Sequence, residues 1–181
     1  MPDQVLHDNI DRVFAILDAD GDGGVRKDDF TSMGRGVARE FGLDEDSPRS
    51  RRLVEGYEAV WDYLCGADLD VDGVVSPAEF REAHTSGRVT TEVLVEKWES
   101  ASRQSFEAAD ADGDGHIDLD GFAGIYRGAG IPDRAVAEAA FGAMDANADG
   151  RVDWTELSAH VRGLFTATDD SAKGAHMVSG G

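Results

Sequence analysis

The chain has 181 residues, 41% of them apolar, which suits one domain or two tightly joined halves with a buried core. It carries 37 acidic against 17 basic residues, a formal charge of −20, so nucleic acid and anionic membranes are excluded as partners and cations are favoured. With no signal-like N-terminus and no membrane-length apolar run, we expect a soluble cytoplasmic protein. The only cysteine, Cys65, allows no internal disulfide, and its place on an apolar helix face favours core packing.

A helix is expected from about residue 3 to residue 17, and it leads into the loop 18–29, DADGDGGVRKDD. This loop places aspartates at positions 1, 3 and 5 and glycine at position 6, the spacing of a twelve-residue calcium loop. Position 12 is Asp29 instead of the usual glutamate. Because aspartate reaches less far, Mg²⁺ competes better with Ca²⁺ here. The expected ligands are Asp18, Asp20, Asp22, Asp29 and the carbonyl of Gly24.

Helices are expected at about 27–41 and 49–66, separated by the charged connection GLDEDSPRSRR. The loop 68–79, DLDVDGVVSPAE, follows and has every feature of the calcium pattern, including the sharp turn at Gly73. Ser76 and Glu79 also have the spacing of a capping box, so Glu79 is expected to cap its helix without metal and to turn to the ion with metal. The expected ligands are Asp68, Asp70, Asp72, Glu79 and the carbonyl of Val74, with Ser76 binding directly or through water.

A long helix is expected at about 90–109, followed by the loop 110–121, DADGDGHIDLDG. Its twelfth residue is Gly121, so the bidentate arm is missing and we expect the weakest site or an empty one. Helices at about 119–127 and 133–144 come next, joined by GAGIPD. The candidate ligands of this third site are Asp110, Asp112, Asp114 and the carbonyl of His116.

The loop 145–156, DANADGRVDWTE, is nearly complete, and a last helix is expected at about 154–165. Residues 167–181 have little apolar content and are expected to be disordered, and their GAHM segment resembles a protease or cloning remnant. The expected ligands of this fourth loop are Asp145, Asn147, Asp149, Glu156 and the carbonyl of Arg151, with Asp153 at position 9.

The residues that flank the loops separate this pattern from other acidic loops. An apolar residue stands four positions before each first ligand and another directly after each twelfth residue, as expected for helices that face a shared core. Position 8 is always β-branched, which suits a short antiparallel contact between loops 18–29 and 68–79 and between loops 110–121 and 145–156. These residues are Phe14, Leu64, Phe106 and Phe141, then Phe30, Phe80, Phe122 and Leu157, and at position 8 Val25, Val75, Ile117 and Val152.

Over residues 3–166 the chain resembles an EF-hand protein, and its uneven loop spacing resembles calerythrin and the sarcoplasmic calcium-binding proteins. The resemblance implies an all-α fold in which four helix-loop-helix units form two pairs packed into a compact globule. The predicted organisation is an N-terminal pair over 1–88, a C-terminal pair over 89–166 and a tail over 167–181.

The functional prediction is an intracellular, monomeric Ca²⁺ buffer or signal modulator with three sites occupied, and with Mg²⁺ an alternative at loop 18–29. A calcium sensor that binds an unidentified target protein is the alternative, but Met33 and Met144 are the only methionines outside the terminal segments, whereas sensor grooves are rich in methionine. A third, less favoured reading is a small-molecule binder like the coelenterazine photoproteins. No nucleophile, base and orienting group share a suitable spacing, so no enzyme is expected.

Overall fold

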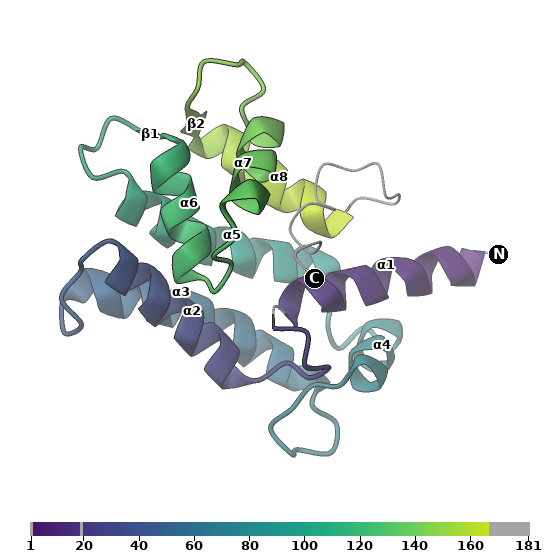
Figure 1. Cartoon of the computed structure of the whole chain (residues 1–181). Coiled ribbons are helices and arrows are strands. Elements are labelled where there is room, and N and C mark those ends of the chain that lie inside the picture. Colours follow the sequence, from purple (N-terminus) through teal and green to yellow (C-terminus); the bar gives the residue numbers. More distant parts are fainter. Residues whose placement is uncertain (1, 19, 167–181) are drawn as a thin grey trace.

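The computed structural model describes residues 2–18 and 20–166, and the side chains from Ile10 onward within these ranges. The described residues are mostly helical, with a short two-stranded sheet (Figure 1). The elements are α1 (Pro2–Leu17), α2 (Lys27–Glu40), α3 (Pro48–Leu64), η1 (Cys65–Ala67), α4 (Pro77–Thr85), α5 (Thr91–Ala109), β1 (His116–Ile117), α6 (Leu119–Gly128), α7 (Arg134–Met144), β2 (Val152–Asp153) and α8 (Trp154–Thr166).

Each expected helix is present, with its ends within two residues of the expected positions. The sequence marks these ends with capping residues: Ser76 and Thr90 each accept a hydrogen bond from the backbone N–H three residues ahead. Pro77 follows Ser76 at the first helical position, where its missing N–H costs nothing. The predicted tail over 167–181 lies outside the described residues, and no described helix has the length and apolarity needed to cross a membrane.

The prediction for Cys65 was wrong, because this residue is exposed. The α-helical period that placed it on an apolar face ends at Leu64, and Cys65 begins the 3₁₀ helix η1. Cys65 follows Leu64 by one position and lies off the buried stripe of α3, which runs through Leu53, Tyr57, Val60 and Leu64. Cys65 Sγ instead lies 3.2 Å from the carbonyl oxygen of Asp62 on the surface.

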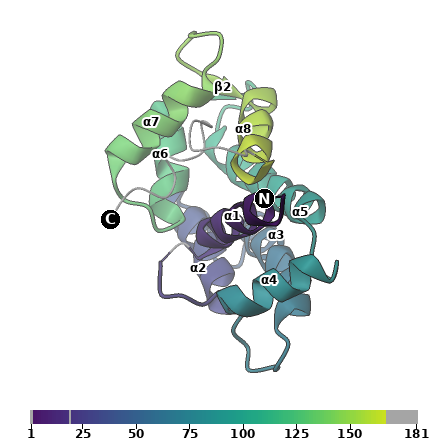
Figure 2. The same cartoon turned by 90° about the vertical axis from the view of Figure 1, so that its right-hand side faces the viewer.

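The loops pair as predicted. Val25 and Val75 exchange two backbone hydrogen bonds, of 3.0 and 2.9 Å, in an isolated antiparallel bridge. In the other half β1 pairs with β2 in antiparallel register, with Ile117 opposite Val152. All four of these side chains are buried. The two loop pairs lie at opposite ends of the molecule, as the two views in Figures 1 and 2 show.

The helices between these ends share one continuous core. In it α1 packs on α4 and α2 on α3, while α5 packs on α8 and α6 on α7, so each half is a pair of helix-loop-helix units. The halves meet where α3 contacts α5 and α2 contacts α6. All eight apolar residues predicted to flank the loops are buried. The fold is therefore the compact all-α globule of four helix-loop-helix units that the sequence predicts.

Trp98 on α5 is the aromatic centre of this core. Its ring lies 6.3 Å from the rings of Phe30 and Tyr57 of the first half and 5.8 Å from that of Phe165 of the second half. The Tyr57 hydroxyl is 2.9 Å from Ser105 Oγ, and both side chains are buried. Apolar packing and a buried hydrogen bond thus cross the 1–88 and 89–166 boundary, so the two predicted units form one core, and that boundary stays a prediction.

Two glycines allow α2 and α6 to cross in close contact. A Cβ on Gly36 would overlap the carbonyl oxygen of Gly128, and a Cβ on Gly128 would lie 2.6 Å from Val37 Cα. Both obstacles are backbone atoms, which cannot move without separating the helices. The crossing therefore fixes the distance between the two halves.

We predict that Gly36→Ala destabilises the protein by about 1–3 kcal/mol, because the added methyl group must push α2 away from α6. Helix propensity alone would stabilise this variant by up to about 1 kcal/mol, so the expected sign is opposite to that of the propensity effect. Gly142→Ala on α7 is the matched control, since nothing lies within 4 Å of a Cβ there. Urea denaturation of both variants measures the difference, and equal stability of the two would contradict the tight crossing.

Candidate metal centres

All four loops have the same backbone turn and the same first hydrogen bond. Glycine at position 6 has φ between 80° and 87° in every loop, a left-handed conformation that side chains with a Cβ disfavour. Its N–H donates to the position 1 carboxylate over 2.9–3.0 Å. This bond holds the first aspartate against the loop and gives each site a local reporter of its state. The glycines are Gly23, Gly73, Gly115 and Gly150.

Position 4 is also left-handed in all four loops, but the loops differ in how they meet this requirement. Loops 18–29 and 110–121 use Gly21 and Gly113, whereas the other two loops place Val71 at φ 61° and Ala148 at φ 57°. A β-branched residue at positive φ is strained, and the Val71 side chain is 84% exposed, so packing does not compensate. The strain is therefore confined to the two loops with a complete set of ligand positions.

In loop 68–79 the carboxylate of Glu79 connects the two ends of the loop. Its Oε2 accepts hydrogen bonds from the Ser76 N–H and hydroxyl at 2.9 and 2.7 Å, and its Oε1 accepts from the Leu69 N–H at 3.0 Å. The bond from the Ser76 hydroxyl, followed by that from the Ser76 backbone, lowers the pKa of Glu79 below its usual value. The predicted capping box is therefore present, and Glu79 caps α4 while it also faces the loop.

Oxygen atoms in this loop converge as a hard cation requires. One carboxylate oxygen each from Asp68, Asp70 and Glu79 lies within 4.8 Å of the others. Carboxylate oxygens are the donors that Ca²⁺ and Mg²⁺ prefer, and the group includes no sulfur or imidazole. The residues of this loop therefore fit a divalent hard cation, and the assignment of each ligand stays a proposal.

Loop 145–156 repeats the arrangement of loop 68–79. Glu156 Oε1 accepts from the Ala146 N–H, and Oε2 accepts from the Asp153 N–H, both over 3.1 Å. Asn147 brings an amide oxygen in place of a carboxylate, and it accepts from the Asp149 N–H over 2.8 Å. The closing glutamate thus spans the same two backbone positions as Glu79 does.

In loop 18–29 the carboxylates of Asp18, Asp20 and Asp22 converge within 4.8 Å. Asp29 Oδ2 accepts from the Arg26 N–H over 2.7 Å, which is the same cap bond that Glu79 makes. Burial raises the pKa of Asp18 and of Asp29, because it disfavours the charged form. Burial thus disfavours ionisation of carboxylates in loop 18–29, whereas hydrogen bonds favour the ionised form of Glu79.

In loop 110–121 the carboxylates of Asp110, Asp112 and Asp114 converge as well. Position 12 supplies no side chain, and the nearby Asp118 caps α6 by accepting from the Gly121 N–H over 2.8 Å. A Cβ at Gly121 would meet nothing closer than 3.4 Å, so space does not dictate the missing arm. The fold thus positions three carboxylates here without the group that would close the cage.

The side chains of two arginines at the loops were given no role by sequence reasoning, which assigned only the backbone carbonyl of Arg151 to a site. Arg26 Nη1 lies 2.6 Å from Asp22 Oδ2, and Arg151 Nη1 lies 2.8 Å from Asp114 Oδ2 in the partner loop. The hydrogen bond from the His116 N–H, followed by the contacts with Arg151, lowers the pKa of Asp114. The signal for Arg26 was present in the sequence, because a basic residue stands at position 9, where the other loops have Ser76, Asp118 and Asp153.

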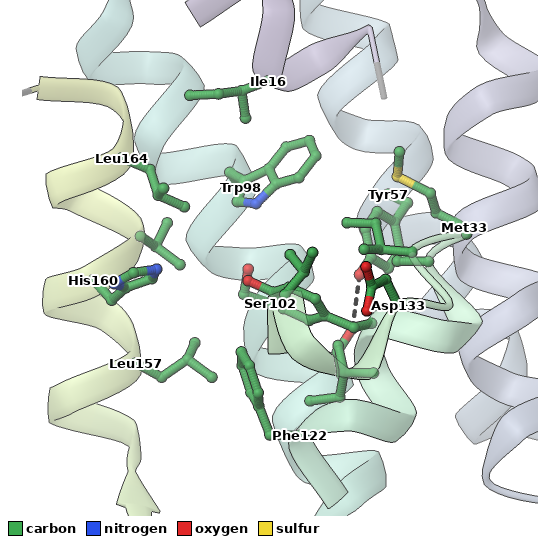
Figure 3. Close-up of a pocket in the computed structure, with 18 of the residues that line it drawn as sticks. Ile16, Met33, Tyr57, Trp98, Ser102, Phe122, Asp133, Leu157, His160 and Leu164 are labelled. Carbon is green, nitrogen blue, oxygen red and sulfur yellow. Dashed lines mark hydrogen bonds between the residues drawn. The ribbon is translucent and has the colours of Figure 1, made fainter. Parts of the chain in front are cut away.

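A cavity of ≈ 450 Å³ lies between the two halves, and residues from α1, α2, α3, α5, α6, α7 and α8 line it. In Figure 3, Trp98 and Ser102 of α5 lie opposite His160 and Leu164 of α8 around this space. Tyr126 also lines the cavity, and its buried hydroxyl has no hydrogen-bond partner among the described residues. Burial raises the pKa of this hydroxyl above its usual value, so the group stays neutral.

We predict that Glu79→Gln lowers calcium affinity at loop 68–79 by about 10–100-fold, the cost of losing a charged partner worth ~1.5–3 kcal/mol. Glutamine keeps an oxygen that can accept from Ser76, so the helix cap should persist, while the bond from the Leu69 N–H is lost. The exposed Glu82→Gln on α4 is the control for the loss of one charge. Calcium calorimetry measures the affinity, and an unchanged value for Glu79→Gln would remove Glu79 from the ligand set.

Comparison with known proteins agrees with this geometry. Residues 99–162 match the family model described as an EF-hand domain pair. Calerythrin of Saccharopolyspora erythraea is 26% identical over 148 residues, covering 77% of this chain and 80% of calerythrin.

Solved structures give the same result. A calcium-binding protein of Streptomyces coelicolor, described in terms of prokaryotic calcium-mediated regulation, superposes with a TM-score of 0.74 at 30% identity, covering 87% of this chain and 96% of that one. The coelenterazine-binding protein of Renilla muelleri shares the fold, with a TM-score of 0.62 at 18% identity over 94% of this chain and 92% of that one. The chain therefore belongs to the EF-hand calcium-binding proteins of the calerythrin type.

Proposed function

We propose that this chain is a calcium buffer or signal modulator that binds Ca²⁺ in loops 68–79, 145–156 and 18–29. The observation that carries the proposal is the closing glutamate of loops 68–79 and 145–156, which faces the loop interior and spans both of its ends. Loop 18–29 is proposed to bind calcium less tightly than these two, because its closing residue is the shorter Asp29, which favours competition by Mg²⁺. Loop 110–121 stays the weakest or an empty site because it lacks a twelfth ligand.

The surface and the core favour a buffer over a sensor. Val71 is the only large apolar side chain that is strongly exposed among residues 10–18 and 20–166. Met33 and Met144 are buried, and the core is dominated by Val, Ala, Phe and Leu. A sensor of the calmodulin kind opens a flexible methionine-rich groove, and these residues do not supply one. We therefore propose modest opening, a monomeric protein and no obligatory target protein.

Crowded carboxylates link metal binding to folding. The carboxylates of each converging group lie within 4.8 Å and repel one another, and a bound divalent cation relieves this repulsion only when the loop is folded. A ligand that binds only the folded state raises its stability. The net charge of −20 adds to this stabilisation of the folded state, because every bound cation also reduces the repulsion across the whole molecule.

We predict that saturating calcium raises the melting temperature by about 5–10 °C for each site that fills, because binding at 100-fold excess over Kd adds ~2.7 kcal/mol per site. Fluorescence of a hydrophobic dye should change little over the same titration. The double variant Glu79→Gln with Glu156→Gln should lose most of the shift, whereas Glu82→Gln should keep it. An unchanged melting temperature would refute the coupling, and strong calcium-induced dye binding would favour the sensor instead.

A second candidate function, binding of a small organic molecule, rests on the cavity between the halves. A volume of ≈ 450 Å³ is in the range of drug-sized ligand sites, and apolar walls with a few polar groups are typical of them. Tyr126 contributes an unpaired hydroxyl that could donate to a ligand acceptor. The coelenterazine-binding protein of Renilla muelleri has the same fold, so coelenterazine is a suitable probe.

We predict that coelenterazine quenches tryptophan fluorescence saturably if this second candidate is correct, because Trp98 lines the cavity. Ser102→Phe should abolish the quenching by filling the cavity, whereas Gly142→Ala, on an open face of α7, should not affect it. Linear quenching without saturation in all three proteins would exclude this ligand and leave calcium binding as the function.

A further inference from the structure

Loop 18–29 differs from the other loops in that one of its own arginines pairs with one of its own carboxylates. Arg26 stands at position 9, and its Nη1 donates to Asp22 Oδ2 over 2.6 Å and to the carbonyl oxygen of Gly24 over 3.0 Å. These oxygens belong to positions 5 and 7, two of the positions that a calcium loop turns towards its ion. The guanidinium thus engages two donors of the expected metal site.

The two complete loops lack such a contact. Asp72 and Asp149 hold the same position 5 and, like Asp22, accept a hydrogen bond from the backbone N–H at position 7. Among the described residues, no arginine, lysine or histidine side chain is paired with a carboxylate of loop 68–79 or loop 145–156. The arginine contact is therefore not a general property of these acidic loops.

We propose that the Arg26 guanidinium is a built-in competitor for the cation of loop 18–29, so that this loop binds calcium only when Arg26 swings out. The proposal rests on the proposed function, and it identifies the residue that sets the order in which the loops fill. A divalent ion among Asp18, Asp20 and Asp22 would lie a few ångströms from the guanidinium, and like charges at such distances repel strongly. The Arg26 side chain is 41% exposed, so it can rotate into solvent, and the result is competition instead of a permanent block.

The second incomplete loop supports the same principle. Loop 110–121 lacks its closing arm, and there Arg151 of the partner loop pairs with Asp114 over 2.8 Å, again at position 5. Both loops without glutamate at position 12 thus have a guanidinium hydrogen-bonded to the carboxylate at position 5. The arginine offsets part of the negative charge that an ion would otherwise neutralise, and the loop stays folded without metal.

The test follows the amides of Gly23, Gly73 and Gly150 by two-dimensional NMR during a calcium titration of the full chain. Each amide donates to the position 1 carboxylate of its own loop, so its chemical shift reports that loop alone. In the wild type, Gly23 should respond at higher calcium than Gly73 and Gly150. Arg26→Gln should lower the calcium midpoint of Gly23 by about fivefold or more, equivalent to ~1 kcal/mol, and should leave the other two within about twofold.

Two further variants separate the charge of Arg26 from its guanidinium geometry and from a general change in net charge. Arg26→Lys keeps the charge but loses the planar fork, so its Gly23 midpoint should lie between those of the wild type and Arg26→Gln. Arg162→Gln removes one positive charge from the Arg162–Glu99 pair outside the loops and should leave the midpoint of Gly23 relative to Gly73 unchanged. Without calcium, Arg26→Gln should melt at a lower temperature than the wild type, because its loop loses a counter-charge.

The outcomes distinguish this inference from the proposed function. If Gly73 and Gly150 titrate but the Gly23 midpoint is the same in Arg26→Gln and in the wild type, Arg26 is not a competitor. A Gly23 amide that fails to respond in every variant would also overturn the inference. If no loop amide responds to calcium in any variant, the proposed function itself fails.

Discussion

Repulsion between like charges held close together is the constraint on which this structure depends. Three of the loops each bring three carboxylates within 4.8 Å of one another, in a chain with a net charge of −20. Backbone N–H groups make this arrangement possible, because they donate to the first carboxylate of every loop from a glycine in a left-handed conformation. The loop backbone thus offsets part of the repulsion between the carboxylates, and a bound cation would neutralise the remainder.

The paired loops and the shared core limit how far each site can move. Val25 and Val75 join the first pair through backbone hydrogen bonds, and Ile117 and Val152 join the second. Trp98 and the close crossing of α2 over α6 then connect the two pairs. A helix that shifts when its loop binds metal must therefore repack against the other half. This restriction agrees with modest opening and with the scarcity of methionine in the core.

The four loops are not equivalent, and each pair joins a complete loop to an incomplete one. Loops 68–79 and 145–156 have a closing glutamate and accept strain at Val71 and Ala148. The partner loops have glycine at position 4 and no glutamate at position 12. In each of them an arginine pairs with the carboxylate at position 5. The complete loop can therefore serve as the stronger metal site of each pair, while an arginine offsets part of the negative charge of its partner loop.

Local patterns predicted most of the fold. Loop spacing, apolar flanks and capping residues such as Ser76 act over a few neighbouring residues, so the eight helices, the loop pairs and the buried flanks followed from them. The end of a regular helix was less predictable: Cys65 was assigned to the core, yet it is exposed where α3 gives way to the 3₁₀ helix η1. The ligand sets proposed from the loop pattern depend on metal binding itself and stay predictions.

The sequence by itself determined that this is an EF-hand protein with two complete and two altered loops, because the twelve-residue pattern is read within each loop. Only the tertiary structure decided which groups meet across the chain. The contact of Arg151 with Asp114 spans 37 residues, and the cavity with its unpaired Tyr126 hydroxyl needs seven helices to enclose it. Such contacts depend on how helices pack, and packing is set by the volumes of many side chains together, which no local spacing encodes.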